Sequence, residues 1–120
     1  LEYIRQKSPT TGEFITAITR FYFDFHWKQE KVIGCVINDP LAVAYLLEPN
    51  LCQGCAAYTT VETTGTAIGQ TLVDSQNFWH RSPNSFILTQ VDAQRFMHIF
   101  LQRLIKATDP ELTTILQQIM

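Results

Sequence analysis

The chain has 120 residues and a formal net charge of −2; 46% of its residues are hydrophobic and only 17% are charged. This length suits one compact domain, and basic residues scattered without a Lys/Arg cluster argue against nucleic acid or an anionic membrane surface as a partner. The longest apolar run, Leu41 to Leu47, is far below the roughly 20 residues of a membrane helix, so we expect a soluble, cytoplasmic protein.

The first part of the chain predicts helices. Leu1 to Arg5 reads like the middle of a helix, so we expect the chain to be a piece of a longer protein. Thr10 followed three residues later by Glu13 is a capping-box pattern, which predicts a helix over residues 11–29. At Asn38-Asp39-Pro40, proline suits the first helical position and the preceding aspartate suits a cap, so a second helix is expected through residue 47.

The second part predicts strands followed by helices. Tyr58 to Thr63 and Thr66 to Val73 are rich in β-branched residues and flank the turn-forming pair Thr64-Gly65, so they predict a β-hairpin. Ser85 to Gln90 predicts a further strand. Two helices are expected after it, beginning after Asp92 and at Asp109-Pro110. This order suits the tail of an α/β layered domain.

The chain contains three cysteines, and an odd number argues against a secreted disulfide framework. Cys52-Gln53-Gly54-Cys55 has the C-x-x-C spacing of redox and zinc sites. A redox motif opens a helix after a strand, however, and a structural zinc site needs four ligands. We therefore interpret these cysteines as reduced, small residues of the core or of turns.

Several ordered motifs resemble one family. Asn38-Asp39-Pro40-Leu41-Ala42-Val43-Ala44-Tyr45 is followed by Val61-Glu62-Thr63, Gly65, Gly69-Gln70-Thr71 and Val73-Asp74. This series resembles the C-terminal third of inosine-uridine-type nucleoside hydrolases over about Phe14 to Ala107. The resemblance implies an α/β fold: residues 1–120 would be the C-terminal fragment of a single Rossmann-like domain with a mixed sheet. Two helices would precede the hairpin, and a further strand and C-terminal helices would follow it.

The resemblance also implies a reaction, namely hydrolysis of the N-glycosidic bond of purine or pyrimidine ribonucleosides to ribose and free base. Asp39 matches the family's C-terminal calcium ligand, although the alternative is that it only caps its helix. The family's N-terminal aspartate motif has no counterpart in the sequence, so we expect this chain alone to be inactive. The alternative function is a non-catalytic binding or assembly module, and the resemblance implies a homo-oligomer, dimer or tetramer.

Asn38 departs from the family, in which a histidine at this place protonates the departing base. An amide has no proton to give near neutral pH, so Asn38 is predicted to contact the base without acting as an acid. Tyr22 and His26 lie four residues apart and share a helix face, which makes them candidates for leaving-group protonation. Trp27 is a candidate for stacking on the base. The alternative is that these three residues only belong to the core and end of an amphipathic helix.

Four further ionisable residues are given structural roles. His98 is expected at a surface or interface, and His80 in a polar loop that can equally be a subunit contact. Glu62 and Asp74 resemble the carboxylate pair of glycosidases. In this family, however, the resemblance assigns the catalytic base to an N-terminal aspartate, so we interpret both carboxylates as structural.

Overall fold

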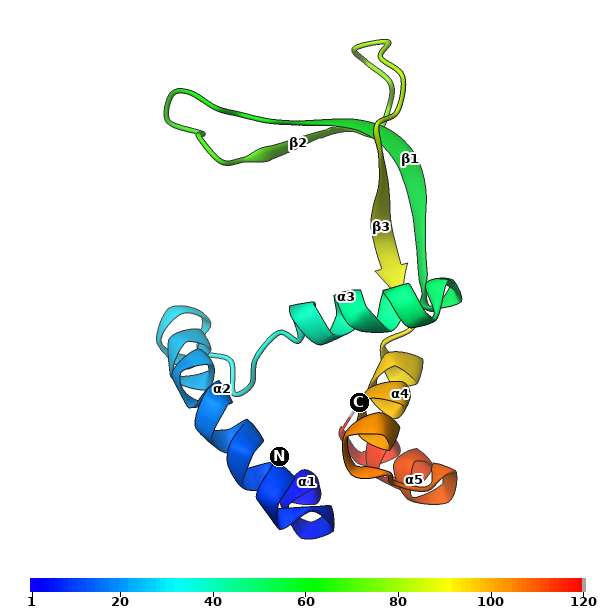
Figure 1. Ribbon diagram of the computed structural model, residues 1–120. Coiled ribbons are helices and arrows are strands. Elements are labelled where there is room, and N and C mark those ends of the chain that lie inside the picture. The colour runs from blue at the N-terminus through cyan, green and yellow to red at the C-terminus, as the bar shows by residue number, and fades with distance from the viewer. Residues whose placement is uncertain (120) are drawn as a thin grey trace. The chain divides into compact units, whose positions relative to one another are not determined.

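The computed structural model describes residues 1–119 and contains five α-helices, one 3-10 turn and three strands in that part of the chain (Figure 1). In chain order these are α1 (Glu2–Lys7), α2 (Pro9–Glu30), α3 (Asn38–Leu47), η1 (Pro49–Leu51), β1 (Cys52–Val61), β2 (Thr71–Asp74), β3 (Ser85–Val91), α4 (Ala93–Ile105) and α5 (Asp109–Ile119). The predicted order of helices, hairpin, strand and helices is confirmed, and α1 precedes it as the Leu1 to Arg5 segment suggested.

The helix starts differ from the prediction. α2 begins at Pro9 with Ser8 as the N-cap, so Thr10 and Glu13 lie inside the helix and form no capping box. Proline at the first helical position has no N–H to satisfy, which explains the earlier start. α3 begins at Asn38, and Asp39 lies in its first turn without a capping hydrogen bond. The alternative in which Asp39 serves as the N-cap is therefore wrong.

The sheet has the order β2-β1-β3, and both pairs are antiparallel. β1 pairs with β3 over Cys52–Ala57 and with β2 over Tyr58–Val61, as Figure 1 shows. The hairpin is confirmed, but β2 begins only at Thr71, because the segment from residue 62 to 70 forms turns with positive φ at Gly65 and Gly69. A mixed sheet stays a prediction for the longer protein.

A side chain continues the β1–β3 ladder past its last pair. The Asn84 amide accepts a hydrogen bond from the Thr59 backbone N–H (2.8 Å) and donates one to the Thr59 carbonyl (2.8 Å). The amide also accepts from the Thr59 hydroxyl at 3.1 Å. Asn84 therefore satisfies the backbone of β1 at the point where β3 leaves it.

The C-x-x-C segment is part of strand β1, and it lies neither in a turn nor at the start of a helix. Cys52 is half-buried and Cys55 is exposed, and both are free thiols. The register shifts between Gln53 and Gly54, and a Cβ on Gly54 would lie 2.1 Å from the carbonyl oxygen of Ile87. Glycine is required here by close backbone approach. The prediction that Cys52 and Cys55 lie in the core or in a turn is therefore wrong, because both belong to the irregular strand β1 and neither is fully buried.

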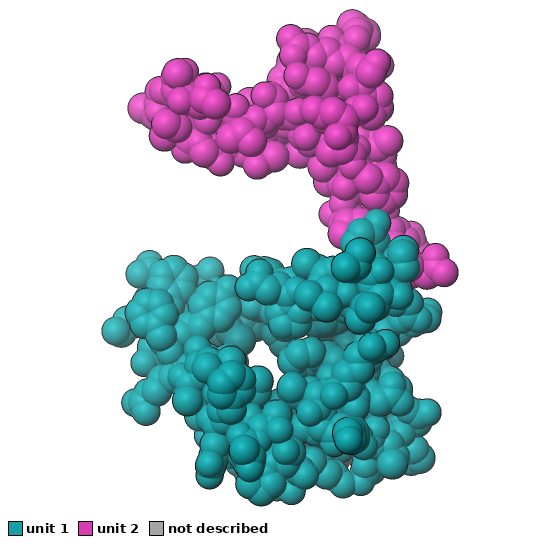
Figure 2. All heavy atoms as spheres, in the orientation of Figure 1, with its two compact units in different colours: residues 1–49, 93–120 teal, residues 50–92 magenta. Residues whose placement is uncertain are grey.

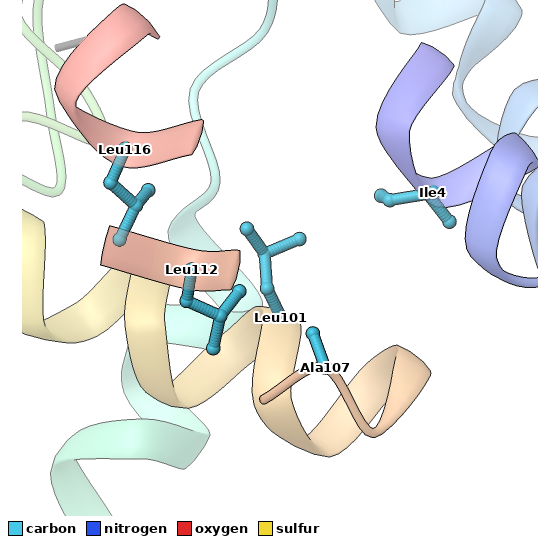
Figure 3. Packing of buried hydrophobic residues seen from close by; sticks show 5 residues of the cluster. All are labelled: Ile4, Leu101, Ala107, Leu112 and Leu116. Atoms are coloured by element: carbon cyan, nitrogen blue, oxygen red, sulfur yellow. The ribbon is translucent and has the colours of Figure 1, made fainter. Parts of the chain in front are cut away.

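The chain divides into two compact units, coloured separately in Figure 2. We call residues 1–49 with 93–119 the helical unit, and residues 50–92 the sheet unit. The helical unit has a core in which Leu101 from α4 packs with Leu112 and Leu116 from α5, and Ile4 of α1 joins them (Figure 3). The prediction of a single domain for residues 1–120 stays a prediction. Within residues 1–119, no helix has the length and apolarity that a bilayer crossing requires.

Candidate functional site

The C-terminal half of α2 brings two of the predicted site residues together. The rings of Tyr22 and His26 meet edge to face with their centroids 4.6 Å apart. Phe25 contacts the same imidazole, with centroids 5.6 Å apart. The shared helix face predicted from the four-residue spacing is therefore confirmed as a direct ring contact.

His26 is buried, with 6% of its surface exposed, whereas Tyr22 is 37% exposed. The Nδ1 atom of His26 lies 3.0 Å from the Oε2 atom of Glu30. Nε2 is buried and has no hydrogen-bond partner among the described residues. Glu30 was missed from the sequence, although its place four residues after His26 was a usable signal. The site thus contains an imidazole with Nδ1 engaged by Glu30 and Nε2 buried without a partner among the described residues.

Trp27 lies beside this pair but faces other residues. Trp27 is 51% exposed as a residue, and the Lys31 ammonium lies 5.7 Å from the centroid of its ring. A pocket of about 210 Å³ is lined by Phe23, Asp24, Trp27, Val32, Ile33 and Gly34. Neither Tyr22 nor His26 lines this pocket. A stacking role for Trp27 therefore stays a prediction, supported by an exposed ring at a concave surface.

Asn38 and Asp39 are exposed in the first turn of α3. Neither side chain forms a hydrogen bond or ion pair with the rest of residues 1–119, and no ring contact or bond links them to Tyr22 or His26. The Asp39 carboxylate is therefore free to bind a cation, and as a hard oxygen donor it suits calcium. Within residues 1–119 no three His, Cys, Asp or Glu side chains are grouped so as to hold a metal ion, so Asp39 fits only as one ligand of a shared site.

A larger pocket, about 440 Å³, lies within the sheet unit and contains none of the predicted site residues. Its wall includes Asp74, whose carboxylate accepts hydrogen bonds from the backbone N–H groups of Phe78 and Trp79, both at 2.7 Å. Burial raises the pKa of Asp74, but backbone hydrogen bonds from Trp79, Phe78 and Gln76, together with the interaction with His80, outweigh burial and hold the pKa below its ordinary value. The Asp74 carboxylate therefore stabilises the loop that follows β2, and the described residues that line the pocket offer no uncommitted carboxylate for catalysis.

Glu62, His98 and His80 belong to local structure or to the surface. Hydrogen bonds from the backbone N–H and hydroxyl of Thr64 lower the pKa of Glu62, so this carboxylate also holds a turn. His98 is half-buried on α4 and its Nε2 lies 3.5 Å from an Asp109 oxygen. His80 is exposed in its loop with φ at 52°. These residues take part in local structure, as expected for Glu62 and Asp74.

Comparisons with known proteins agree with the resemblance. The family described as inosine-uridine preferring nucleoside hydrolase matches residues 1–98. The chain is 33% identical over 106 residues to the pyrimidine-specific ribonucleoside hydrolase RihA of Salmonella newport (strain SL254), covering 86% of this chain and 34% of that protein. It is 31% identical over 106 residues to the protein of the same name from Escherichia coli (strain IAI39), with the same coverage.

Solved structures give the same result. A purine-preferring ribonucleoside hydrolase from Gardnerella vaginalis superposes with a TM-score of 0.66 at 27% identity, over 80% of this chain and 31% of that one. The plant nucleoside hydrolase PpNRh1 superposes with a TM-score of 0.71 over 81% of this chain and 33% of that one, and at 22% identity shows the fold alone. The chain spans about a third of the length of the curated relatives it matches. By the match over residues 1–98, it belongs to the inosine-uridine preferring nucleoside hydrolase family.

Proposed function

We propose that this chain is the C-terminal part of a ribonucleoside hydrolase, which uses water to cleave the N-glycosidic bond and release ribose and free base. The family match over residues 1–98 carries the proposal. The relatives include a pyrimidine-specific and a purine-preferring enzyme, so the proposal covers ribonucleosides of either base class. A homo-oligomer stays part of the proposal, to be measured by analytical ultracentrifugation.

The apolar surface of the helical unit supports a larger parent protein. Along α2, Phe14, Ile18, Phe21 and Phe25 repeat at helical spacing, and each is at least 45% exposed. On α3, Val43 and Leu46 are 59% and 80% exposed. Soluble monomers rarely leave apolar patches of this kind uncovered. In the proposed enzyme, the remaining two thirds of the hydrolase packs on these faces, and the chain alone does not turn over.

In the proposed site each predicted residue has one role. Asp39 is one ligand of a calcium ion, and the ion, when bound, supplies a Lewis acid for the ribose hydroxyls and the attacking water. Asn38 contacts the base without protonating it. His26 donates the proton to the departing base, while Tyr22 and Trp27 contact the base. The buried imidazole supports the role of His26, and the uncommitted carboxylate supports the role of Asp39.

A non-catalytic binding or assembly module is the second candidate. The observation that favours it is that residues 1–119 group no complete set of metal ligands. In that case the chain acts as a stand-alone product, and its exposed apolar faces bind another protein.

Ribose release from several nucleosides, with calcium added or chelated, tests the proposal. We expect no turnover by residues 1–120 alone, and calcium-dependent turnover when the coding sequence is extended upstream to the length of the relatives. In that longer protein, Asp39→Asn should reduce kcat/KM by about 100-fold or more, because a ligand of the catalytic ion is lost. Glu13→Gln, an exposed change on α2, is the matched control. An unreduced kcat/KM in the Asp39→Asn protein would refute the role of Asp39, and an inactive longer protein would favour the binding module.

A further inference from the structure

We infer that Glu30 is a positioning residue that keeps a proton on Nδ1 of His26 and thereby assigns Nε2 as the atom that meets the nucleoside base. The inference deepens the proposed function and rests on it for the role of His26.

The first observation is the hydrogen bond between the two side chains. The His26 Nδ1 and Glu30 Oε2 atoms are 3.0 Å apart, with 7% of the His26 side chain and 52% of the Glu30 side chain exposed. An ionised carboxylate can only accept hydrogen bonds. The proton in this bond therefore belongs to Nδ1, and a neutral His26 carries its lone pair on Nε2.

The second observation is the state of the other nitrogen. Nε2 is buried and has no hydrogen-bond partner among the described residues. Buried polar atoms are nearly always paired, because leaving one unpaired costs its full desolvation energy. Tyr22 and Phe25 hold the ring by edge contacts, so it cannot turn freely to exchange its two nitrogens. A fixed ring with one uncommitted nitrogen is suited to meet an external polar group.

The position of Glu30 argues against a role in stabilising the helix. Glu30 is the last residue of α2, where the negative end of the helix dipole disfavours a carboxylate. Side chains on a helix lean toward its N-terminus, so Glu30 reaches back to residue 26. Of the other helices of this unit, α1 packs most closely on α2, and its charged Arg5 binds Thr16, far along the helix from His26. Among the described residues, Glu30 is the charged side chain that contacts the His26 imidazole.

This arrangement has a consequence for the proposed proton transfer. The doubly protonated ring gives its Nε2 proton to the base, while the electron pair of the C1′–N bond moves onto that base. Water adds its hydroxyl group to C1′ and releases its other proton to the solvent, and the solvent returns a proton to Nε2 of His26 before the next turnover. The neutral ring left behind is the Nδ1–H form that Glu30 already holds, so no exchange of tautomers is needed.

The first test measures the tautomer directly in the 120-residue chain labelled with ¹⁵N-histidine. Long-range ¹H–¹⁵N correlations at mildly alkaline pH report which nitrogen is protonated, and the His26→Gln variant identifies the His26 signals. We expect the Nδ1–H form in the wild-type chain. We expect a loss of that form in Glu30→Gln, because an amide can donate as well as accept. Glu13→Gln on the same helix should leave the signals unchanged. An Nε2–H form in the wild-type chain, or no change in Glu30→Gln, overturns the inference.

The second test uses the longer hydrolase. Glu30→Gln should lower kcat by about 10-fold while KM changes less than about twofold, since Glu30 acts through His26 and not on the bound nucleoside. An unchanged kcat in Glu30→Gln, together with a large loss in His26→Gln, overturns the positioning role but preserves the proposed function. An unchanged kcat in His26→Gln instead overturns the proposed role of His26 as the acid.

Discussion

The helical unit and the sheet unit are stabilised in different ways. In the helical unit, leucines from α4 and α5 form a core in which Leu112 is 0% exposed and Leu116 is 2% exposed. Among the described residues of the sheet unit, the buried hydrophobic residues are Leu51 and Ala57. That unit depends instead on its backbone ladder and on side chains such as Asp74 and Asn84 that bond to loop and strand backbone. We therefore expect truncation of buried side chains to destabilise the helical unit most, and enlargement of a tightly packed residue to destabilise the sheet unit most.

Removing atoms from the helical core should have the largest effect on stability. Leu112→Ala deletes a fully buried side chain and should lower the free energy of unfolding of the helical unit by about 2–5 kcal/mol. Urea unfolding followed by circular dichroism at 222 nm measures this loss. Thr113→Ala, at an exposed neighbouring position of α5, is the control. Since alanine is the best helix former, a loss cannot come from helix propensity, and an equal loss in both variants would contradict a packing role specific to Leu112.

Adding one methyl group to the sheet unit should have the next largest effect. Gly54→Ala places a Cβ against the Ile87 carbonyl oxygen, so β1 and β3 must separate locally, at a cost of about 1–3 kcal/mol. Hydrogen exchange of amides in β1 and β3 should speed up, while amides of α4 and α5 keep their protection. Gly65→Ala strains the turn after β1, where φ is 72°, but its Cβ meets no other atoms, so it should leave the β1–β3 amides unchanged. Equal protection of β1 and β3 in the wild-type and Gly54→Ala chains would contradict the close approach.

The smallest effect is expected from an exposed ion pair of the helical unit. The hydrogen bond from the Lys7 ammonium, followed by those from Thr108, lowers the pKa of Glu111 from 4.5 to about 2. A lowered pKa stabilises the folded state fully above about pH 4.5, and this contribution disappears as pH falls toward 2. Thermal melts between pH 5 and pH 2 should therefore show a steeper decline for the wild-type chain than for Glu111→Gln. Equal falls in melting temperature for the two chains would show that Glu111 does not cause the loss of stability at low pH.

Much of the fold could be predicted because its elements have local signals. The hairpin follows from β-branched residues around Thr64-Gly65, and the later helices follow from residues that begin them. The errors have local causes as well: Pro9 starts α2 earlier than the Thr10 pattern indicated, and turns interrupt the Thr-rich segment after Val61. The start of β1 at Cys52 could not be predicted, because its pairing with β3 depends on residues more than 30 positions away.

Less of the candidate site could be predicted. Helical spacing placed Tyr22 and His26 on one face, and the structure brings their rings into contact. Burial of His26 and the engagement of Nδ1 by Glu30 depend on side-chain packing, which spacing alone does not specify. Asp39, in contrast, is exposed, and its carboxylate has no partner among the described residues. Its proposed role therefore comes entirely from the family resemblance.

The Asn84 amide also determines what β1 offers to other molecules. An unpaired strand edge is a template for chains that aggregate by adding strands. At Thr59 both the backbone N–H and the carbonyl are already bonded to the Asn84 side chain. An incoming strand would find no free donor or acceptor on the backbone of this residue. The Asn84 amide therefore protects the backbone of β1 from strand addition at the point where β3 ends, and no further strand is needed there.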